Sequence, residues 1–88
     1  MKNKLLQIIN HYGLDKQLKY IHSEYFELDE AIISGDKPIH IAEEIADIQV
    51  MLKQFQYYYE IEDSEVEQIM AEKIDRQIKR IESEENDL

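Results

Sequence analysis

Apolar residues recur at steps of three and four along most of the chain, which is the spacing of one face of an α-helix. The longest row comprises Leu14, Leu18, Ile21, Tyr25, Leu28 and Ile32. After a short polar interruption, a second row comprises Ile41, Ile45, Ile48, Leu52, Phe55 and Tyr59. These rows predict two amphipathic helices joined by one short turn.

Residues that favour helix ends set the limits of these two helices. Asp15 is a good N-cap, and Gly35 suits the position just after a helix, so the first of the pair is predicted from near Asp15 to Ser34. Pro38 is favoured in a first helical turn and begins the second, which reaches about Tyr59. The turn between them is short enough to make the two helices antiparallel neighbours.

Two further helices complete the predicted fold. One covers about Lys2 to Tyr12 and ends at Gly13. The other opens with Ser64-x-x-Glu67, a capping-box pattern, and carries the apolar row Val66, Met70, Ile74, Ile78 and Ile81. The sequence therefore predicts an all-α protein: a small, four-helix bundle-like protomer with an antiparallel central hairpin. Residues 82–88 are expected to form a frayed acidic tail.

Two pairs of carboxylates, each spaced by three residues, lie on the central helices. They are Glu24 with Glu27, and Glu44 with Asp47. If the helices fold back at Gly35, Glu24 lies level with Asp47. Glu27 then lies level with Glu44, because the residue numbers of both cross-pairs add to 71. At about 100° per residue, both pairs also flank their apolar row on the same side.

Four acidic groups in one small volume repel one another unless a hard cation neutralises them. The spacing therefore predicts a metal site formed by these four residues. The alternative is chance, because 20 of the 88 residues are acidic and most such spacings are solvated helix faces.

Oxygen ligands select Mg²⁺, Mn²⁺ or Ca²⁺ over zinc or copper. A di-iron site in a helical bundle needs Glu-x-x-His on two helices. Neither His11, His22 nor His40 stands three residues after a candidate glutamate. We therefore expect Mg²⁺, with Mn²⁺ as a substitute.

Mg²⁺ is usually completed by water and substrate phosphates, so basic residues are expected near it. On the last helix, Lys73, Gln77 and Arg80 lie on one flank of the apolar row. They form a candidate phosphate-binding set. Equally, they form a solvated stripe that pairs with glutamates, as Glu72 can with Arg76.

Length and charge restrict the classes of function. Eighty-eight residues make one domain, 1–88, so small that a homo-oligomer, either a homodimer or a homotetramer, is expected to complete its core. The net charge of −10 argues against binding polymeric nucleic acid or an anionic membrane. There is no cysteine, no apolar run of membrane-spanning length and no secretory segment, so we expect a cytoplasmic protein.

The combined pattern resembles the MazG-like all-α nucleoside triphosphate pyrophosphohydrolases, a group that includes dimeric dUTPases and dCTP pyrophosphatases. The resemblance extends from about Tyr12 to Arg80. The motifs that carry it are Gln17-Leu18, residues 24–28, residues 43–48, residues 73–75 and Arg80.

The resemblance implies Mg²⁺-dependent cleavage of a nucleoside triphosphate between its α- and β-phosphates, which gives a monophosphate and pyrophosphate. It makes the four carboxylates the catalytic metal ligands, one of which orients the attacking water. It makes Lys73 and Arg80 phosphate-binding residues, with Gln77 where relatives often have asparagine. The alternative is a non-catalytic acidic helical module that mediates interactions or senses nucleotides.

Overall fold

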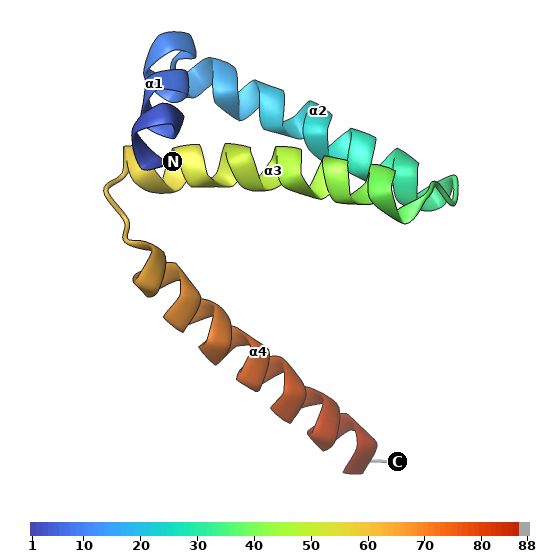
Figure 1. Cartoon of the computed structure of the whole chain (residues 1–88). Helices are drawn as coiled ribbons and strands as arrows, with labels where there is room; N and C mark the ends of the chain where they lie inside the picture. Colours follow the sequence, from blue (N-terminus) through green and yellow to red (C-terminus); the bar gives the residue numbers. More distant parts are fainter. Residues whose placement is uncertain (87–88) are drawn as a thin grey trace.

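Four helices and short connections make up the computed structural model, which describes residues 1–86. The helices are α1 (Lys2–Tyr12), α2 (Leu14–Ile33), α3 (Pro38–Tyr58) and α4 (Asp63–Asn86), and residues 1–86 contain no strand. Figure 1 shows α2 and α3 as an antiparallel hairpin, with α1 across its open end and α4 leading away. The all-α class and the antiparallel central hairpin are therefore confirmed.

The turn that closes the hairpin forms at the predicted glycine. Gly35 has φ of 71°, a left-handed conformation that glycine adopts without steric cost. The amide of Asp36 donates to the carbonyl of Ala31 at 2.9 Å, and the amide of Gly35 donates to that of Ile32 at 3.1 Å. These bonds satisfy the last carbonyls of α2, whose C-cap is Ser34.

Asp36 also interacts with the first residues of α3. Its carboxylate accepts a hydrogen bond from the Lys37 amide at 2.8 Å and lies 2.8 Å from His40 Nδ1. Pro38 occupies the first turn of the helix, as predicted. The return of the chain is thus fixed by local interactions at both sides of the turn.

The seam between α2 and α3 is rotated relative to the predicted apolar rows. Its buried and half-buried positions include Gln17, Ile21, Glu24, Leu28 and Ala31 on α2, and Ile41, Glu44, Ile48, Met51, Gln54 and Phe55 on α3. The exposed remainder of the rows includes Leu18, Tyr25 and Ile32 on α2, and Ile45, Leu52 and Tyr59 on α3. Only part of each predicted apolar row therefore lies in the core of the single chain.

The rotation follows from the packing of α1. This helix packs chiefly against α3 and buries Leu5 and Ile9 in the process. Met51, Gln54 and Tyr57 of α3 are also buried, although none of them belongs to the predicted apolar row of this helix. The polar seam residues therefore come inside while part of the apolar row stays outside.

The junction between α3 and α4 has the same backbone hydrogen-bond pattern as the hairpin turn, with Glu60 in the position of the glycine. Glu60 has φ of 58°, and the amide of Ile61 donates to the carbonyl of Gln56 at 3.0 Å. The chain then starts α4 at Asp63. The amide of Val66 donates to the carbonyl of Glu62, so Glu62 occupies the position before the helix.

This start differs from the predicted capping box at Ser64. Because α4 begins one residue earlier, Ser64 lies inside the first turn, and within residues 1–86 it makes no side-chain hydrogen bond to the Glu67 amide. The Asp63 carboxylate instead anchors the helix start to α3. It accepts hydrogen bonds from Lys53 Nζ at 2.7 Å, from Gln56 Nε2 at 2.8 Å and from the Tyr57 hydroxyl at 2.9 Å.

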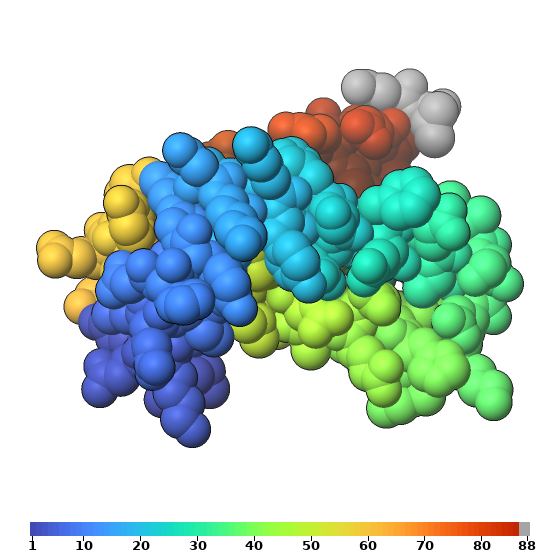
Figure 2. Space-filling model, turned by 90° about the horizontal axis from the view of Figure 1, so that it is seen from above, coloured from blue at the N-terminus to red at the C-terminus, as the bar shows by residue number. Residues whose placement is uncertain are grey.

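Beyond this anchor, α4 stands apart from the rest of the chain. Within the described part of the chain it packs against none of the other helices and contains no buried residue. The space-filling view shows α1, α2 and α3 gathered together with the end of α4 behind them (Figure 2). The expected acidic tail is helical as far as Asn86, and residues 87 and 88 lie outside the described residues.

None of the four helices is long and apolar enough to span a lipid bilayer, over the residues that the structure describes.

Candidate metal centre

Three of the predicted carboxylates meet in the middle of the hairpin seam. Glu24 comes from α2, and Glu44 and Asp47 come from α3. One carboxylate oxygen of each lies within 4.8 Å of the other two. Side chains three and four apart project from the same face of a helix, so the seam brings both members of the α3 pair toward α2.

The three carboxylates form a gradient from the interior to the surface. Glu24 is only 5% exposed, Glu44 is half-buried and Asp47 is exposed. Glu24 Oε2 and Glu44 Oε2 are both buried, and neither accepts a hydrogen bond from any group in residues 1–86. A buried acceptor without a donor costs about 1–3 kcal/mol, and more when it is charged. Two such oxygens within one cluster of carboxylates are suited to binding a cation.

The electrostatics of the seam disfavour ionisation of both glutamates in the absence of a cation. Burial raises the pKa of Glu24, and the negative charges of Glu27 and Asp47 raise it further, against a lowering influence of the Tyr20 hydroxyl. Burial also raises the pKa of Glu44, and the charges of Glu27 and Asp47 add to the effect. A divalent cation would reverse this balance by favouring the ionised carboxylates.

The fourth predicted ligand lies at the edge of the cluster. Glu27 is exposed and does not belong to the three residues whose oxygens lie within 4.8 Å of one another. Its negative charge nevertheless raises the pKa of Glu44. Glu27 and Glu44 also line one shallow hollow of about 350 Å³ near the turn. The cross-pairing predicted from residue numbers thus places Glu27 beside Glu44.

A groove runs from the carboxylates along the hairpin toward α1. Glu24 and Asp47 line a small cavity of about 170 Å³. An adjoining cavity of about 350 Å³ shares three lining residues with it: Tyr20, Val50 and Met51. The far end of the larger cavity is formed by Tyr12, Lys16, Gln17 and Gln54. The groove therefore joins acidic oxygens to an aromatic and amide-lined compartment.

Tyr20 and Lys16 line this groove, although neither was assigned to the site from the sequence. They precede Glu24 by four and eight residues, so they lie on the same flank of α2, and this spacing was the signal available. The nearby Glu24 carboxylate raises the pKa of the Tyr20 hydroxyl. Tyr20 therefore lies close enough to the carboxylates to interact with anything that binds there.

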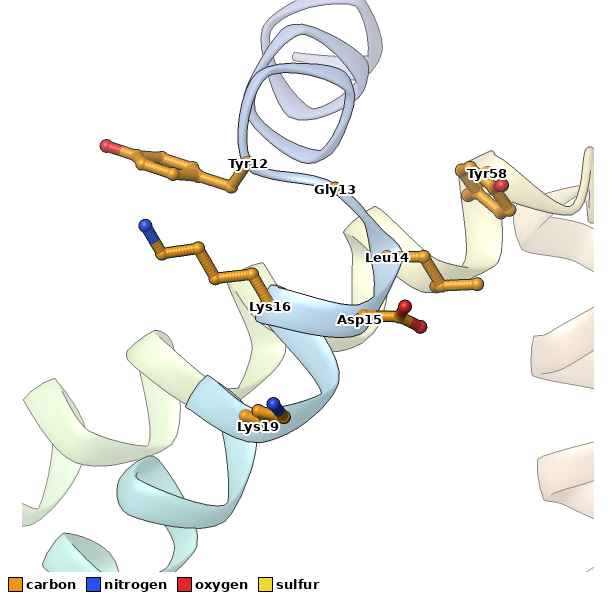
Figure 3. A pocket seen from close by; sticks show the side chains of 7 residues that line it. All are labelled: Tyr12, Gly13, Leu14, Asp15, Lys16, Lys19 and Tyr58. Carbon is orange, nitrogen blue, oxygen red and sulfur yellow. The ribbon is translucent and has the colours of Figure 1, made fainter.

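Lysines occupy the end of α2 that is remote from the turn. Lys16 and Lys19 line an open hollow of about 650 Å³ at the junction of α1 and α2, together with Tyr12 and Tyr58 (Figure 3). The ammonium group of Lys16 lies over the Tyr12 ring, 5.2 Å from its centroid. Lys16 thus lines both this hollow and the groove that leads to the carboxylates.

The predicted phosphate-binding residues are not brought to the carboxylates within one chain. Lys73, Gln77 and Arg80 are exposed on α4, which packs against neither α2 nor α3 in the described residues. Figure 1 shows α4 running away from the hairpin. A single copy of the chain therefore presents acidic groups in the seam and the three α4 side chains on a separate helix.

Comparison with protein-family models, with curated proteins and with solved structures found no match to this chain.

Proposed function

We propose that this chain is a Mg²⁺-dependent nucleoside triphosphate pyrophosphohydrolase, which cleaves an NTP or dNTP to the monophosphate and pyrophosphate. The observation that carries the proposal is the pair of buried, unpartnered oxygens on Glu24 and Glu44 beside Asp47. The reaction class comes from the resemblance of the paired carboxylates to MazG-like enzymes. Mn²⁺ is expected to replace Mg²⁺, because both favour oxygen ligands.

The donor set suits a hard divalent cation. All three clustered groups offer carboxylate oxygens, and no histidine or cysteine joins them in the described residues. Glu24 and Glu44 would supply inward-facing oxygens, while the exposed Asp47 faces solvent, where phosphate oxygens and water can approach. Glu27, at the edge, is available to complete the set or to hold water.

The chain's own residues then have distinct roles in the hydrolysis. When bound, Mg²⁺ would neutralise phosphate charge and make a coordinated water more acidic. Asp47 or Glu27, which are exposed, would orient water and accept its proton as its oxygen attacks the α-phosphorus. The bond from that phosphorus to the bridging oxygen breaks, and pyrophosphate leaves. Tyr20 and Gln17 line the space beside the carboxylates and would position the nucleoside.

A second candidate is a non-catalytic module that binds nucleotide and metal as a sensor. It is favoured by the separation of Lys73 and Arg80 from the carboxylates in one chain, because phosphate transfer depends on cationic groups positioned at the phosphates. The same separation is also compatible with a non-enzymatic acidic helical adaptor that binds no nucleotide.

The proposal also covers the cellular compartment and the oligomeric state. We expect the enzyme to act in the cytoplasm on free nucleotides, without binding polymeric nucleic acid or membrane. We also expect a homodimer or homotetramer, which would cover the apolar side chains that the single chain exposes.

One assay separates these functions. The chain is incubated with a panel of natural and modified nucleoside triphosphates and Mg²⁺, and the products are resolved. Monophosphate with pyrophosphate is the expected outcome, whereas diphosphate with orthophosphate would reject the reaction class. Metal titration in the same buffer reports on the sensor: saturable Mg²⁺ or Mn²⁺ binding without turnover of any nucleotide would favour it. No metal binding would leave the acidic adaptor.

A further inference from the structure

The surface of a single chain is much larger than that of a compact protein of its mass. Its accessible area is 7299 Å², whereas a folded monomer of 10.6 kDa exposes about 5,500 Å². Its radius of gyration is 16.6 Å, compared with about 12 Å for a compact domain of this length. The excess of about 1,800 Å² is more than twice the roughly 800 Å² that each partner buries in a standard interface.

A row of exposed apolar side chains runs along one side of the hairpin. Relative to Glu24, Tyr25 lies about 100° around α2 in one direction, while Tyr20 and Glu27 lie about 40–60° in the other. The same holds on α3, where Leu52 and Asp47 lie on opposite flanks of Glu44. The hairpin row, defined as Leu18, Tyr25, Ile32, Ile45, Leu52 and Tyr59, is exposed and faces away from the acidic groove.

A second exposed row runs along α4. It consists of Val66, Met70, Ile74, Ile78 and Ile81, and all but the half-buried Val66 are about half exposed. At 1.5 Å per residue it extends for about 22 Å, and the α2 part of the hairpin row, Leu18 to Ile32, extends for about 21 Å. The α4 row and the hairpin row thus match in length and in apolar character.

Charge does not oppose contact between the two surfaces. Over the span of the α4 row, residues 66–81 carry four basic and three acidic residues, a net charge of +1. The clustered carboxylates of the hairpin lie on the side away from the hairpin row, so they do not face this contact.

The chain's own α4 does not cover its own hairpin row. The Asp63 carboxylate is held by Lys53, Gln56 and Tyr57 of α3, which fixes where α4 begins. From this anchor α4 runs away from the hairpin, and within residues 1–86 it contacts neither α2 nor α3 along its length (Figure 1). Both rows are therefore available to another molecule in this conformation.

We infer that the partner is a second copy of this chain, and that the α4 row of each copy packs on the hairpin row of the other. Two such reciprocal contacts would cover both apolar rows of both copies. The combined surplus of about 3,600 Å² lies within the range of obligate homodimers. Since the hairpin row faces away from Glu24 and Asp47, this pairing leaves the acidic groove open to ligand.

The first test measures mass in solution by light scattering after gel filtration. The wild-type chain is expected at twice 10.6 kDa or a higher multiple. Ile74→Gln with Ile78→Gln removes apolar area from the α4 row without changing charge, and should weaken association about 100-fold or more. The matched control, Glu72→Gln with Lys79→Gln, alters the opposite face of α4 with no net charge change and should remain associated.

Complementation then tests whether the α4 row of one copy packs on the hairpin row of the other. Tyr25→Gln with Leu52→Gln should also give monomers, and mixing these chains with the Ile74→Gln, Ile78→Gln chains should restore dimers. The mixed pair retains one intact α4 row and one intact hairpin row that meet. A monomeric wild type, an associated α4 variant or a mixture that stays monomeric would each overturn the inference. Helical circular dichroism verifies folding in every variant, and Mg²⁺ titration of the monomeric variant reports separately on the carboxylates.

Discussion

Gln17 and Gln54 hold the register of the central hairpin through a buried hydrogen bond. Gln17 Nε2 donates to Gln54 Oε1 at 2.8 Å, and Gln54 is only 1% exposed. Glu24 follows Gln17 by seven residues and Asp47 precedes Gln54 by seven, which is about two helical turns in each case. The amide pair and the carboxylates therefore share one register, and a shift at the first would misplace the second.

Replacing one member of this pair is expected to destabilise the protein. Gln17→Leu leaves the Gln54 amide oxygen buried without its donor, which costs about 1–3 kcal/mol. Urea unfolding followed by circular dichroism measures the loss. Gln17→Leu with Gln54→Leu should recover part of it, because two apolar groups replace a polar pair. A double variant that is destabilised by the sum of the single losses would show that the two amides are not coupled.

The turn and the antiparallel register could be predicted because both depend on local chemistry. Gly35 ends α2 in a left-handed conformation, and Pro38 begins α3, so the connection has little freedom. Once its length is fixed, residues equidistant from the turn must meet. The spatial approach of Glu24, Glu44 and Asp47 follows from this rule.

The rotation of the seam could not be predicted, because two overlapping rows on α2 have helical spacing. One contains Leu18 and Tyr25, and the other contains Gln17 and Glu24. Hydrophobicity favours the first, yet the packing of α1 against α3 selects the second. Long-range packing therefore decides between two patterns of equal period, and this is why Glu24 is buried.

The separation of α4 from the other helices also could not be predicted from local sequence patterns. Its apolar row is as regular as those of α2 and α3, and this regularity predicts a packed face but not its partner. The three side chains proposed for phosphate binding share a flank of α4 as expected from their spacing. In the single chain that flank does not meet the carboxylates, because α4 packs against neither α2 nor α3 within residues 1–86.

Replacing the most buried carboxylate by its amide is expected to abolish activity and stabilise the metal-free protein. Glu24→Gln removes a metal ligand, so kcat/KM for nucleotide hydrolysis should fall about 100-fold or more. It also relieves repulsion among carboxylates in the seam, so the melting temperature without metal should rise by about 5 °C. Glu43→Gln is the control, since Glu43 is exposed and lies outside the cluster. Full turnover in Glu24→Gln would remove the assignment of this residue.

The stability of the metal-free chain is expected to fall as pH rises above about 4.5. In the fold, burial raises the pKa of Glu24 and of Glu44 above the ordinary value of 4.5. The protonated forms are therefore favoured by folding, and their contribution is complete below pH 4.5 and lost as pH rises through the raised pKa values. Saturating Mg²⁺ should reverse the trend, because it binds the ionised groups. Melting temperatures at pH 4.5 to 7.5, with and without metal, measure both slopes.

The variant with Glu24→Gln and Glu44→Gln provides the control for this pH dependence. Its melting temperature should vary less over the same range, since neither amide titrates. A metal-free wild type that becomes more stable from pH 4.5 to 7 would contradict the assignment of the titration to these two glutamates.

The anchor at Asp63 is expected to stabilise the α3–α4 junction with the opposite pH dependence. Hydrogen bonds from Lys53, then Gln56 and Tyr57, lower the pKa of Asp63 from 3.8 to about 2. Its contribution is therefore complete above pH 3.8 and is lost as pH falls through about 2. Asp63→Asn should lower the melting temperature by a few degrees at pH 7 and speed amide exchange at residues 61–66, with the difference vanishing near pH 2. Ser64→Ala is the matched control, because Ser64 does not cap α4, and an equal loss in that variant would show that the helix start, rather than the carboxylate anchor, supplies the stability.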